Sequence, residues 1–406
     1  MSAFSDFMDG LPDGPIGVAV SGGSDSVALL VLAVEWARKS DRAVMAATVD
    51  HGLRDAAADE AKGVAKLCAR MDVPHRILRW DGVHSGNTQD AARRARQRLI
   101  GDWANEQSLA AIASGHTRED QAETFLLRLK RGSGVDGLAG MAPKIIKDDV
   151  LWVRPVLNAR RAELREILTA RGVGWVDDPS NNDVRFDRVK IRNALKMLGE
   201  IGLSVDVLAD TAGRMQTARG ALEAATLGVA QRVAEPREIG SVRLIVSLLC
   251  DQPQEIQLRL LAHTLRWISG AEYRPRLNAL KLALTAVIDG YGHTLAGCLI
   301  APKKNGITEV SREPAAMSPS DAQSGVFDGR WACDATEGIW RPLGKDGLQQ
   351  RPDWREVAEH RNSLLSSPSL WYNNELKSAP FVDKYSACKC KLRVGPESFF
   401  ATIVTH

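Results

Sequence analysis

Hydrophobic and polar positions follow two alternating patterns along residues 16–157. Short apolar runs have the length of buried strands and lie at 16–20, 43–49, 75–80, 110–114 and 151–156. Longer segments between them repeat apolar residues every three or four positions, as helices do, and lie at 25–38, 55–71, 87–106 and 118–130. Strands that alternate with helices are typical of a parallel sheet covered by helices. The pattern therefore predicts an α/β fold for a first domain at 1–200.

Residues 203–301 have an almost continuous helical period. Apolar residues of this segment fall on one stripe, for example Leu258, Leu261, Leu265 and Ile268. We therefore predict an all-α second domain at 201–292.

The period of the pattern changes to two near His293. Apolar residues alternate along 294–301 and 307–312, and the Asn305-Gly306 dipeptide between these runs favours a tight hairpin turn. We predict a small α+β domain at 293–406 that contains this hairpin. Its segment 313–324 is rich in Ala, Ser and Pro and is predicted to be a loop.

The composition is that of a folded globular protein. Of the 406 residues, 44% are hydrophobic and 25% charged, which excludes a disordered chain and a fibrous repeat. The net charge of +3 gives no sign of a nucleic-acid partner, so only local clusters of charge can indicate one. The acidic start of the chain, broken by Pro12 and Gly14, differs from a signal peptide, and the most apolar long stretch, 282–302, contains Asp289 and His293. We expect a cytoplasmic protein with no membrane contact.

The six cysteines are scattered along the chain, which favours reduced and mostly buried thiols. Only Cys388 and Cys390 lie close together. A Cys-Lys-Cys pair without nearby histidines is a weak signal for a structural metal site, so buried thiols are the simpler interpretation.

The sequence Ser-Gly-Gly-Ser-Asp-Ser at 21–26 joins the first predicted strand to the first predicted helix. Such a loop lies at the carboxyl end of a strand, where open α/β sheets bind ligands. Its glycines, N–H groups, hydroxyls and helix N-terminus suit a phosphate, and Asp25 among them suits Mg²⁺. A plain strand-to-helix turn capped by Asp25 is the simpler interpretation of the SGG triplet alone. The loop lacks the GxxxxGK[ST] pattern, which excludes a Walker-type nucleotide site.

Residues 21–26 resemble the PP-loop of the N-type ATP pyrophosphatases, which split ATP into AMP and pyrophosphate. Further motifs resemble the tRNA(Ile)-lysidine synthase family and occur in that family's order: VDHGLR at 49–54, GHTREDQAET at 115–124, RGSG at 131–134, GLAGM at 137–141, DPSN at 178–181 and RVKIR at 188–192. The resemblance is dense from residue 16 to about 195 and only architectural beyond. The chain departs from the family pattern at Thr117-Arg118-Glu119, but Asp120 is present.

The resemblance implies a two-step reaction on isoleucine tRNA with a CAU anticodon. ATP adenylates the C2 oxygen of the wobble cytidine, and the ε-amine of free L-lysine then displaces AMP to give lysidine. It further implies a PP-loop ATP-binding catalytic domain that uses Mg²⁺, followed by helical and C-terminal domains that contact the tRNA. The resemblance leaves open whether the protein forms a homodimer.

The resemblance also assigns roles to individual residues. Those expected to bind ATP are Ser21, Gly22, Gly23, Ser24, Asp25, Ser26, Asp50 and His51. Asp25, Asp120 and Glu123 are the expected catalytic residues, and Asp25 and Asp120 the expected Mg²⁺ ligands. Because Asp120 and Glu123 are three apart at the start of a helix, they share one face, although helix capping also explains such a pair. Glu123 is the candidate for receiving the lysine amine, with Asp178 as the alternative.

Arginines gather at 154–192, where Arg188 and Arg192 lie four apart on one helical face. A solvated helix face is the usual meaning of such a pattern, but beside a PP-loop we predict contact with tRNA phosphates. Asp178 and Asn181 complete the set expected to bind lysine or tRNA. Three candidates are less specific. The cluster of Arg93, Arg94, Arg96 and Arg98 could bind the RNA backbone, and Trp175 could stack on a base or be buried. His116 either lies at the ligand-binding edge of the sheet or has a structural role.

Two alternative functions fit parts of the sequence. A PP-loop tRNA thiolase would need cysteines near its active site, and the first domain contains only Cys68, in a helical segment. A tRNA-binding protein with an inactive ATP site would not need Asp25, Asp120 and Glu123, which are all present. Both alternatives are therefore disfavoured.

Overall fold

The computed structural model describes residues 2–50, 52, 55–80, 88–176, 187–303, 305–357 and 359–404. The chain forms two compact units, Met1–Arg219 and Gly220–Thr405. Within the described ranges, no helix is both long and apolar enough to cross a membrane.

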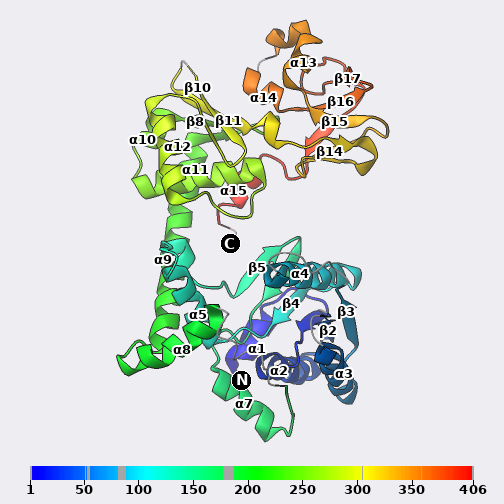
Figure 1. The fold of residues 1–406 in the computed structure, drawn as a ribbon, viewed down its shortest axis with the longest axis vertical. Helices are drawn as coiled ribbons and strands as arrows, with labels where there is room; N and C mark the ends of the chain where they lie inside the picture. The colour runs from blue at the N-terminus through cyan, green and yellow to red at the C-terminus, as the bar shows by residue number, and fades with distance from the viewer. Residues whose placement is uncertain are drawn as a thin grey trace. The chain divides into compact units, whose positions relative to one another are not determined.

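The first unit is built on a six-stranded sheet of order β3-β2-β1-β4-β6-β5 (Figure 1). Its strands are β1 (Ile16–Ala19), β2 (Val44–Asp50), β3 (His75–Arg79), β4 (Ala111–Ser114), β5 (Lys144–Lys147) and β6 (Val150–Val153). All neighbouring pairs are parallel except β5 and β6. The predicted α/β fold with a parallel sheet is confirmed.

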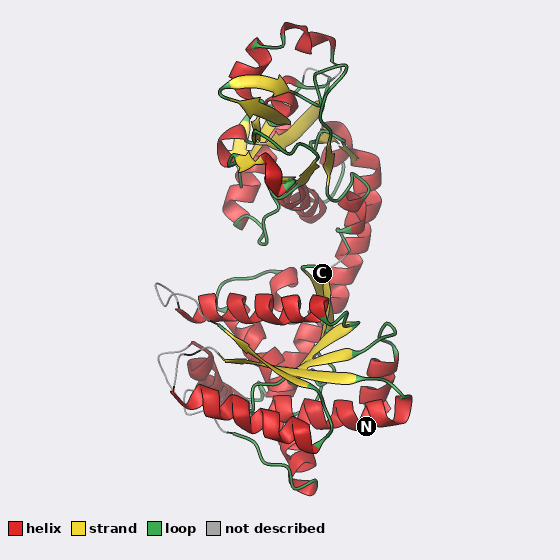
Figure 2. Cartoon of the chain, turned by 90° about the vertical axis from the view of Figure 1, so that its right-hand side faces the viewer, coloured by secondary structure: helices red, strands yellow, loops and turns green. Residues whose placement is uncertain are grey.

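Helices cover both faces of this sheet (Figure 2). The helices of the first unit are α1 (Ser2–Asp9), α2 (Ser24–Ser40), α3 (Asp55–Arg70), α4 (Thr88–Glu106), α5 (Arg118–Leu129), α6 (Val135–Leu138), α7 (Arg161–Ala170), α8 (Asp187–Glu200) and the start of α9 (Val205–Val233). Helix α2 is the most deeply buried, because all residues from Val27 to Val34 lie in the core. It fixes the loop that precedes it.

The strand order creates a switch point beside β1. The chain runs from β1 to β2 and β3 on one side of the sheet, then returns to place β4 on the other side of β1. Helices on either side of such a point diverge and leave a crevice at the carboxyl ends of the strands. The loops after β1 and β4 therefore open into the same space.

The second unit begins with a five-stranded sheet of order β7-β8-β11-β10-β9. Its elements are β7 (Ala234–Pro236), β8 (Val242–Ile245), α10 (Val246–Cys250), α11 (Gln254–Ser269), α12 (Leu277–Asp289), β9 (His293–Leu295), β10 (Cys298–Pro302) and β11 (Ile307–Arg312). The antiparallel hairpin of β10 and β11 agrees with the predicted one. The predicted strand at 294–301 is divided, because Ala296 and Gly297 turn the chain with positive φ values of 53° and 68°.

The prediction of an almost continuous helical segment over 203–301 is wrong at β8, and the loop predicted at 235–237 overlaps strand β7. Val242 and Leu244 are buried and alternate with less buried neighbours, the period of a strand. Strand β8 pairs with β11, with Val242 opposite Val310. One sheet thus contains residues from both sides of the predicted 292/293 boundary, and the two units differ from the three predicted domains.

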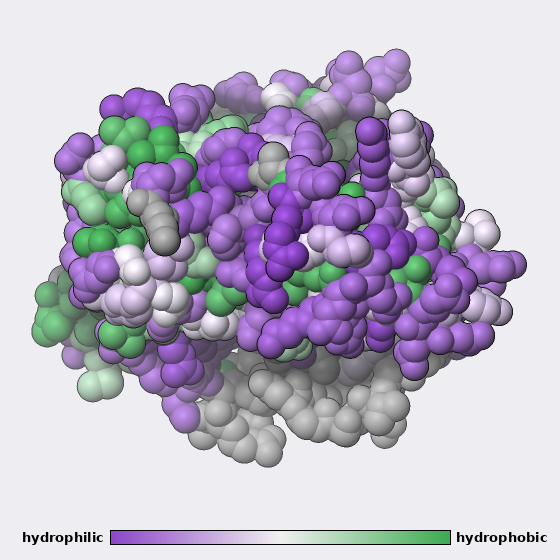
Figure 3. Space-filling view, turned by 90° about the horizontal axis from the view of Figure 1, so that it is seen from above, coloured by the Kyte–Doolittle hydropathy of each residue, from purple (hydrophilic) through white to green (hydrophobic). Residues whose placement is uncertain are grey.

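The rest of the second unit contains two smaller sheets, of order β12-β15-β16-β17 and β13-β14-β18. Their strands are β12 (Ser320–Asp321), β13 (Val326–Phe327), β14 (Trp331–Cys333), β15 (Ile339–Pro342), β16 (Pro368–Tyr372), β17 (Glu375–Ser378) and β18 (Cys390–Leu392). Short helices are η2 (Pro314–Ala316), η3 (Ala322–Ser324), α13 (Gly344–Gln349), η4 (Pro352–Glu356), α14 (Arg361–Leu365) and α15 (Ser398–Ala401). The predicted loop at 313–324 contains η2, β12 and η3. The face seen in Figure 3 is mostly hydrophilic, with hydrophobic side chains in small groups, as is usual for protein surfaces.

Glu309 on β11 is the centre of a buried polar cluster in the second unit. Its carboxylate accepts hydrogen bonds from Ser241 Oγ at 2.8 Å and Ser363 Oγ at 2.6 Å, and it pairs with Arg243 and Lys303. Burial would raise the pKa of Glu309, but Lys303 and the two serines lower it to about 2. The ionised carboxylate therefore holds β8, β11 and α14 together.

Candidate functional site

The loops that follow β1 and β4 meet at the switch point of the first sheet. A Cβ atom added to Gly115 would lie 3.0 Å from the backbone carbon and oxygen of Asp25 and from Cα of Ser26. Real Cβ atoms rarely come so close to a backbone, so glycine is needed for this approach. The predicted loop at 21–26 is thereby held against the start of α5.

The loop at 21–26 is shaped by its own hydroxyls. Gly22 has a φ of +89°, which favours glycine. The Ser26 hydroxyl donates to Gly23 O at 3.0 Å and accepts from Ser21 N at 3.1 Å. Val27 N then donates to Gly23 O and begins the helical bonding of α2. The loop therefore carries the positive end of the α2 dipole toward the crevice.

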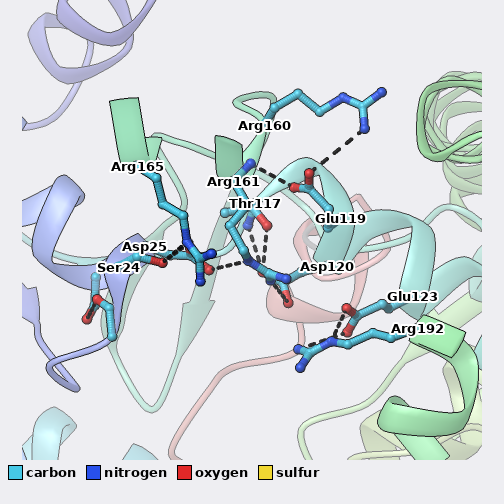
Figure 4. Close-up of polar contacts among 12 residues, drawn as sticks. Ser24, Asp25, Thr117, Glu119, Asp120, Glu123, Arg160, Arg161, Arg165 and Arg192 are labelled. Atoms are coloured by element: carbon cyan, nitrogen blue, oxygen red, sulfur yellow. Dashed lines mark hydrogen bonds and ion pairs between the residues drawn. The ribbon is translucent and has the colours of Figure 1, made fainter. Parts of the chain in front are cut away.

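Two carboxylates face one guanidinium beside this loop (Figure 4). Arg161, the first residue of α7, donates from Nε to Asp25 Oδ2 at 2.8 Å, and its Nη2 lies 3.6 Å from Asp120 Oδ1. The Arg161 backbone N–H donates to Glu119 Oε2 at 3.0 Å, which fixes the start of α7 against α5. Three elements distant in sequence thus bring two negative groups and one positive group together.

Asp120 also performs the capping role that helix statistics favour. Its Oδ2 accepts from Thr117 N at 2.8 Å and from Thr117 Oγ1 at 3.0 Å, while Oδ1 faces Arg161. Burial alone would raise the pKa of Asp120, but Arg161 and the Thr117 N–H lower it below its usual value. The carboxylate is therefore ionised, and one of its oxygens faces the crevice cation.

Glu123 lies one turn further along α5 and has an exposed fraction of 0%. It accepts from Arg192 Nε of α8 at 2.5 Å and from Nη2 at 3.5 Å. Burial raises the pKa of Glu123, Arg192 opposes that shift, and the nearby Asp120 charge adds to it. Glu123 therefore binds a proton more readily than an ordinary carboxylate, although it is paired with a cation.

Helix α7 directs a second arginine at the loop. Arg165 Nε donates to Ser24 Oγ at 3.3 Å, and the Arg165 guanidinium lies 5.8 Å from the centre of the Trp175 ring. Trp175 packs against the core, and Val176 N donates to Gly22 O at 2.9 Å. For Trp175 the structure agrees with the interpretation as a packed side chain.

The motifs at 131–134 and 137–141 follow α5 and bond to it, the first through Ser133 N, which donates to Arg128 O at 3.1 Å. Gln121 bonds the Met141 backbone in both directions, donating to its oxygen at 2.9 Å and accepting from its nitrogen at 2.7 Å. Arg128 Nη1 donates to the carbonyl oxygens of Gly137 and Gly140 at 2.7 and 2.8 Å. These contacts hold the helix that carries Asp120 and Glu123, two of the three catalytic candidates.

The other predicted site residues are more scattered. Asp50 ends β2 and accepts from Gly52 N at 3.0 Å. Arg188 is exposed on α8, one turn before Arg192, and its charge helps to lower the pKa of Asp120. His116 Nδ1 lies 3.0 Å from Ser114 Oγ. The predicted residues His51, Asp178 and Asn181, and the Arg93 side chain, lie outside the described part of the chain.

The two α7 arginines were not predicted from the sequence as individual site residues. Arg161 and Arg165 are four apart, so they share one face of α7, and they follow closely after a buried strand of the sheet. That spacing was visible in the sequence. Their target was not, because it depends on α7 packing beside α2.

Comparisons with known proteins agree with this geometry. A family model described as a PP-loop domain matches residues 2–198. The chain is 40% identical over 399 residues to the tRNA(Ile)-lysidine synthase of Ruegeria pomeroyi, covering 97% of this chain and 95% of that protein. It is 39% identical over 308 residues to the protein of that name from Hyphomonas neptunium, covering 74% of this chain and 82% of that protein.

Among solved structures, the U34-tRNA thiolase NcsA from Methanococcus maripaludis with its [4Fe-4S] cluster matches with a TM-score of 0.46 and 14% identity. The match covers 53% of this chain and 78% of that one. This likeness is too distant to support a functional argument.

Proposed function

Because this chain belongs to the tRNA(Ile)-lysidine synthase family, we propose that it joins free L-lysine to C2 of the wobble cytidine in isoleucine tRNA with a CAU anticodon. The reaction consumes ATP and gives lysidine, AMP and pyrophosphate. The observation that carries the proposal is the meeting of the PP-loop with Asp25, Asp120 and Arg161 at the sheet's switch point. The anion-binding loop suits the leaving pyrophosphate of an ATP-dependent adenylation, and the carboxylates suit a metal ion that screens phosphate charge.

The PP-loop residues are assigned to the pyrophosphate part of ATP. Backbone N–H groups at the start of α2 and the hydroxyls of Ser21 and Ser24 stabilise the negative charge that develops on the leaving pyrophosphate. Arg165 adds positive charge at Ser24. Asp50, at the end of the neighbouring strand, is assigned to the nucleoside side of the crevice because β2 lies next to β1.

Asp25 and Asp120 fit a Mg²⁺ ion because both already face one cation, the Arg161 guanidinium. In the described part of the chain, no three His, Cys, Asp or Glu side chains are grouped to hold a metal. Mg²⁺ is commonly bound by one or two carboxylates together with substrate phosphates and water, so two carboxylates suffice. When bound, the ion would neutralise phosphate charge.

Glu123 is proposed to receive the ε-ammonium of lysine. The ammonium has a reference pKa of about 10.4 and must lose a proton before it attacks. The raised pKa of Glu123 suits a proton acceptor. Its partner Arg192 must then share the carboxylate with the incoming amine. Asp178 remains the alternative acceptor.

Arg188 is proposed to contact tRNA phosphates, because it is exposed on the same face of α8 as Arg192. The second unit is proposed to contact the tRNA beyond its anticodon. A homodimer also remains a prediction, and sedimentation analysis of the free protein would measure it.

The test is to incubate the protein with ATP, labelled lysine and total tRNA, and to identify the nucleoside that carries the label. We expect lysidine from the native chain and none from Asp25→Asn. Asp41→Asn is the matched control, since Asp41 is exposed at the opposite end of α2. Label appearing in protein or in another nucleoside would contradict the proposal.

The two half-reactions test the role of Glu123. Glu123→Gln should still form adenylated tRNA but lose lysine transfer, while Glu166→Gln, an exposed change on α7, should retain both. Loss of adenylation in Glu123→Gln would instead place Glu123 in the first step.

A thiolase function is not favoured by the first unit. Its one cysteine, Cys68, is 0% exposed, and burial raises its pKa to about 11. A thiol in this state is a poor nucleophile.

A further inference from the structure

Three cysteine thiols gather in the second unit, at the end of β14 and the start of β18. Cys333 lies directly opposite Cys390 in the antiparallel pair of these strands, and Cys388 lies two residues before Cys390. We propose that Cys333 and Cys390 form a reversible cross-strand disulfide, and that Cys388 is the thiol through which a small-molecule disulfide enters. The proposal is independent of the proposed enzymatic function.

The backbone hydrogen bonds place the pair at a favourable register. Arg393 N donates to Arg330 O, and Asp334 N donates to Lys389 O, so these residue pairs are the hydrogen-bonded ones of the ladder. Cys333 N instead donates to Gly325 O, away from β18. The Cys333 and Cys390 pair is therefore a non-hydrogen-bonded one, in which Cα atoms are about 4.5 Å apart. That separation lies within the roughly 4.4–6.8 Å found for disulfides.

The three thiols differ in access to solvent. Cys333 and Cys390 are each 9% exposed and belong to one hydrophobic cluster with Trp331 and Phe327. Cys388 packs against this cluster from the side and is only partly buried. An oxidant thus reaches Cys388 more easily than either partner of the cross-strand pair.

The chemistry is thiol–disulfide exchange with a small disulfide such as oxidised glutathione. The Cys388 thiolate attacks one sulfur and releases a glutathione thiolate, which leaves a mixed disulfide. The Cys333 thiolate attacks Cys388 Sγ and expels the second glutathione thiolate, and the Cys390 thiolate then attacks Cys333 Sγ and releases Cys388. In total, two protein thiols and one small disulfide give one protein disulfide and two small thiols.

The environment makes this exchange slow at neutral pH. Burial, followed by the Asp334 charge, raises the pKa of Cys388, so little thiolate is present near pH 7. Although the three thiols lie near one another, no group of His, Cys, Asp or Glu side chains within the described ranges is arranged to hold a metal ion. The disulfide would therefore form under prolonged oxidising conditions and not under brief ones.

The test treats the full chain with oxidised glutathione, blocks free thiols, and identifies linked peptides by mass spectrometry. We expect a peptide pair joined through Cys333 and Cys390, restored to thiols by reduced glutathione. The rate should rise about tenfold from pH 7 to pH 8, because the thiolate is the attacking species. Amide hydrogens of β18 should exchange more slowly in the oxidised protein.

Matched variants separate the roles of the thiols. Cys388→Ser should form the same disulfide at least about tenfold more slowly, because a buried thiol must then react first. Cys250→Ser, which removes an exposed thiol on α10, should leave the rate unchanged. A lasting Cys388 mixed disulfide with Cys333 and Cys390 still free would overturn the proposal, and so would a final bond between any other two cysteines.

Discussion

Replacing Arg192 by Ala should destabilise the first unit, because it removes the partner of a fully buried carboxylate. Glu123 is 1% exposed in its side chain and Arg192 28%, so water reaches the pair only from the arginine side. Breaking a buried ion pair by removing one partner costs about 3 kcal/mol at the lower end of measured values, which suits this half-open geometry. Arg188→Ala, one turn earlier on α8, removes an exposed side chain and should cost less than about 0.5 kcal/mol.

The pH dependence of the Arg192→Ala effect has a defined sign. Burial already raises the pKa of Glu123, and losing Arg192 raises it further. A protonated carboxyl is cheaper to bury than a carboxylate, so the destabilisation should be largest near pH 8 and shrink toward pH 5. The stabilisation that Arg192 supplies is therefore complete above the pKa of Glu123 in the folded variant, and it fades as pH falls toward the lower pKa of Glu123 in the native fold.

Hydrogen exchange of amides in α5 and α8 measures this free energy for the first unit alone. The same variants can be tested for tRNA binding at several salt concentrations. Arg188→Ala should make the slope of log K against log salt shallower by roughly 0.7–0.9, because one phosphate contact is lost. Arg192→Ala with native exchange rates and a shallower salt slope would refute the reasoning, since it would make Arg192 a phosphate contact.

Three further predictions concern other parts of the molecule. Arg161→Ala should lower tRNA-dependent pyrophosphate release at least about tenfold, and more strongly at lower pH because the pKa of Asp120 rises without its cation; native rates would contradict this. Gly115→Ala should cost about 1–3 kcal/mol in thermal unfolding, whereas the control Gly101→Ala, in open space on α4, should stabilise slightly. Glu309→Gln should lower the free energy of urea unfolding by about 3 kcal/mol at pH 7, because folding lowers the pKa of Glu309 from 4.5 to about 2. The difference from the native chain should fade as pH drops from 4.5 to 2. A constant difference would show that charge is not the cause.

Periodicity located strands β1 to β4 and β6 and helices α2 to α5, because each of them has a strong signal. Strand β1 is a short apolar run, β4 is apolar up to Ser114, and α2 and α5 begin within motifs whose spacing is itself informative. The antiparallel edge strand β5 was not predicted, because it has only four residues and both the first and the last, Lys144 and Lys147, are charged. A short edge strand gives too little pattern to be distinguished from a loop.

The site was predicted in composition but not in its pairings. Asp25 and Asp120 could be placed at one sheet edge, because parallel strands end there together. The Arg192 contact with Glu123 and the Arg161 contact with Asp25 join residues far apart in the sequence. Such contacts depend on how α7 and α8 pack, which periodicity does not encode.

The pairing of β8 with β11 limits how the polypeptide can be dissected. A fragment ending at residue 292 would leave β8 without the neighbour that covers one of its edges, exposing unpaired N–H and C=O groups that recruit other chains. A fragment starting at 293 would hold β11 with the complementary edge open. When the two fragments are coexpressed, we expect them to associate by pairing β8 with β11. A cut at this position therefore suits a split-protein complementation experiment better than the preparation of independent domains.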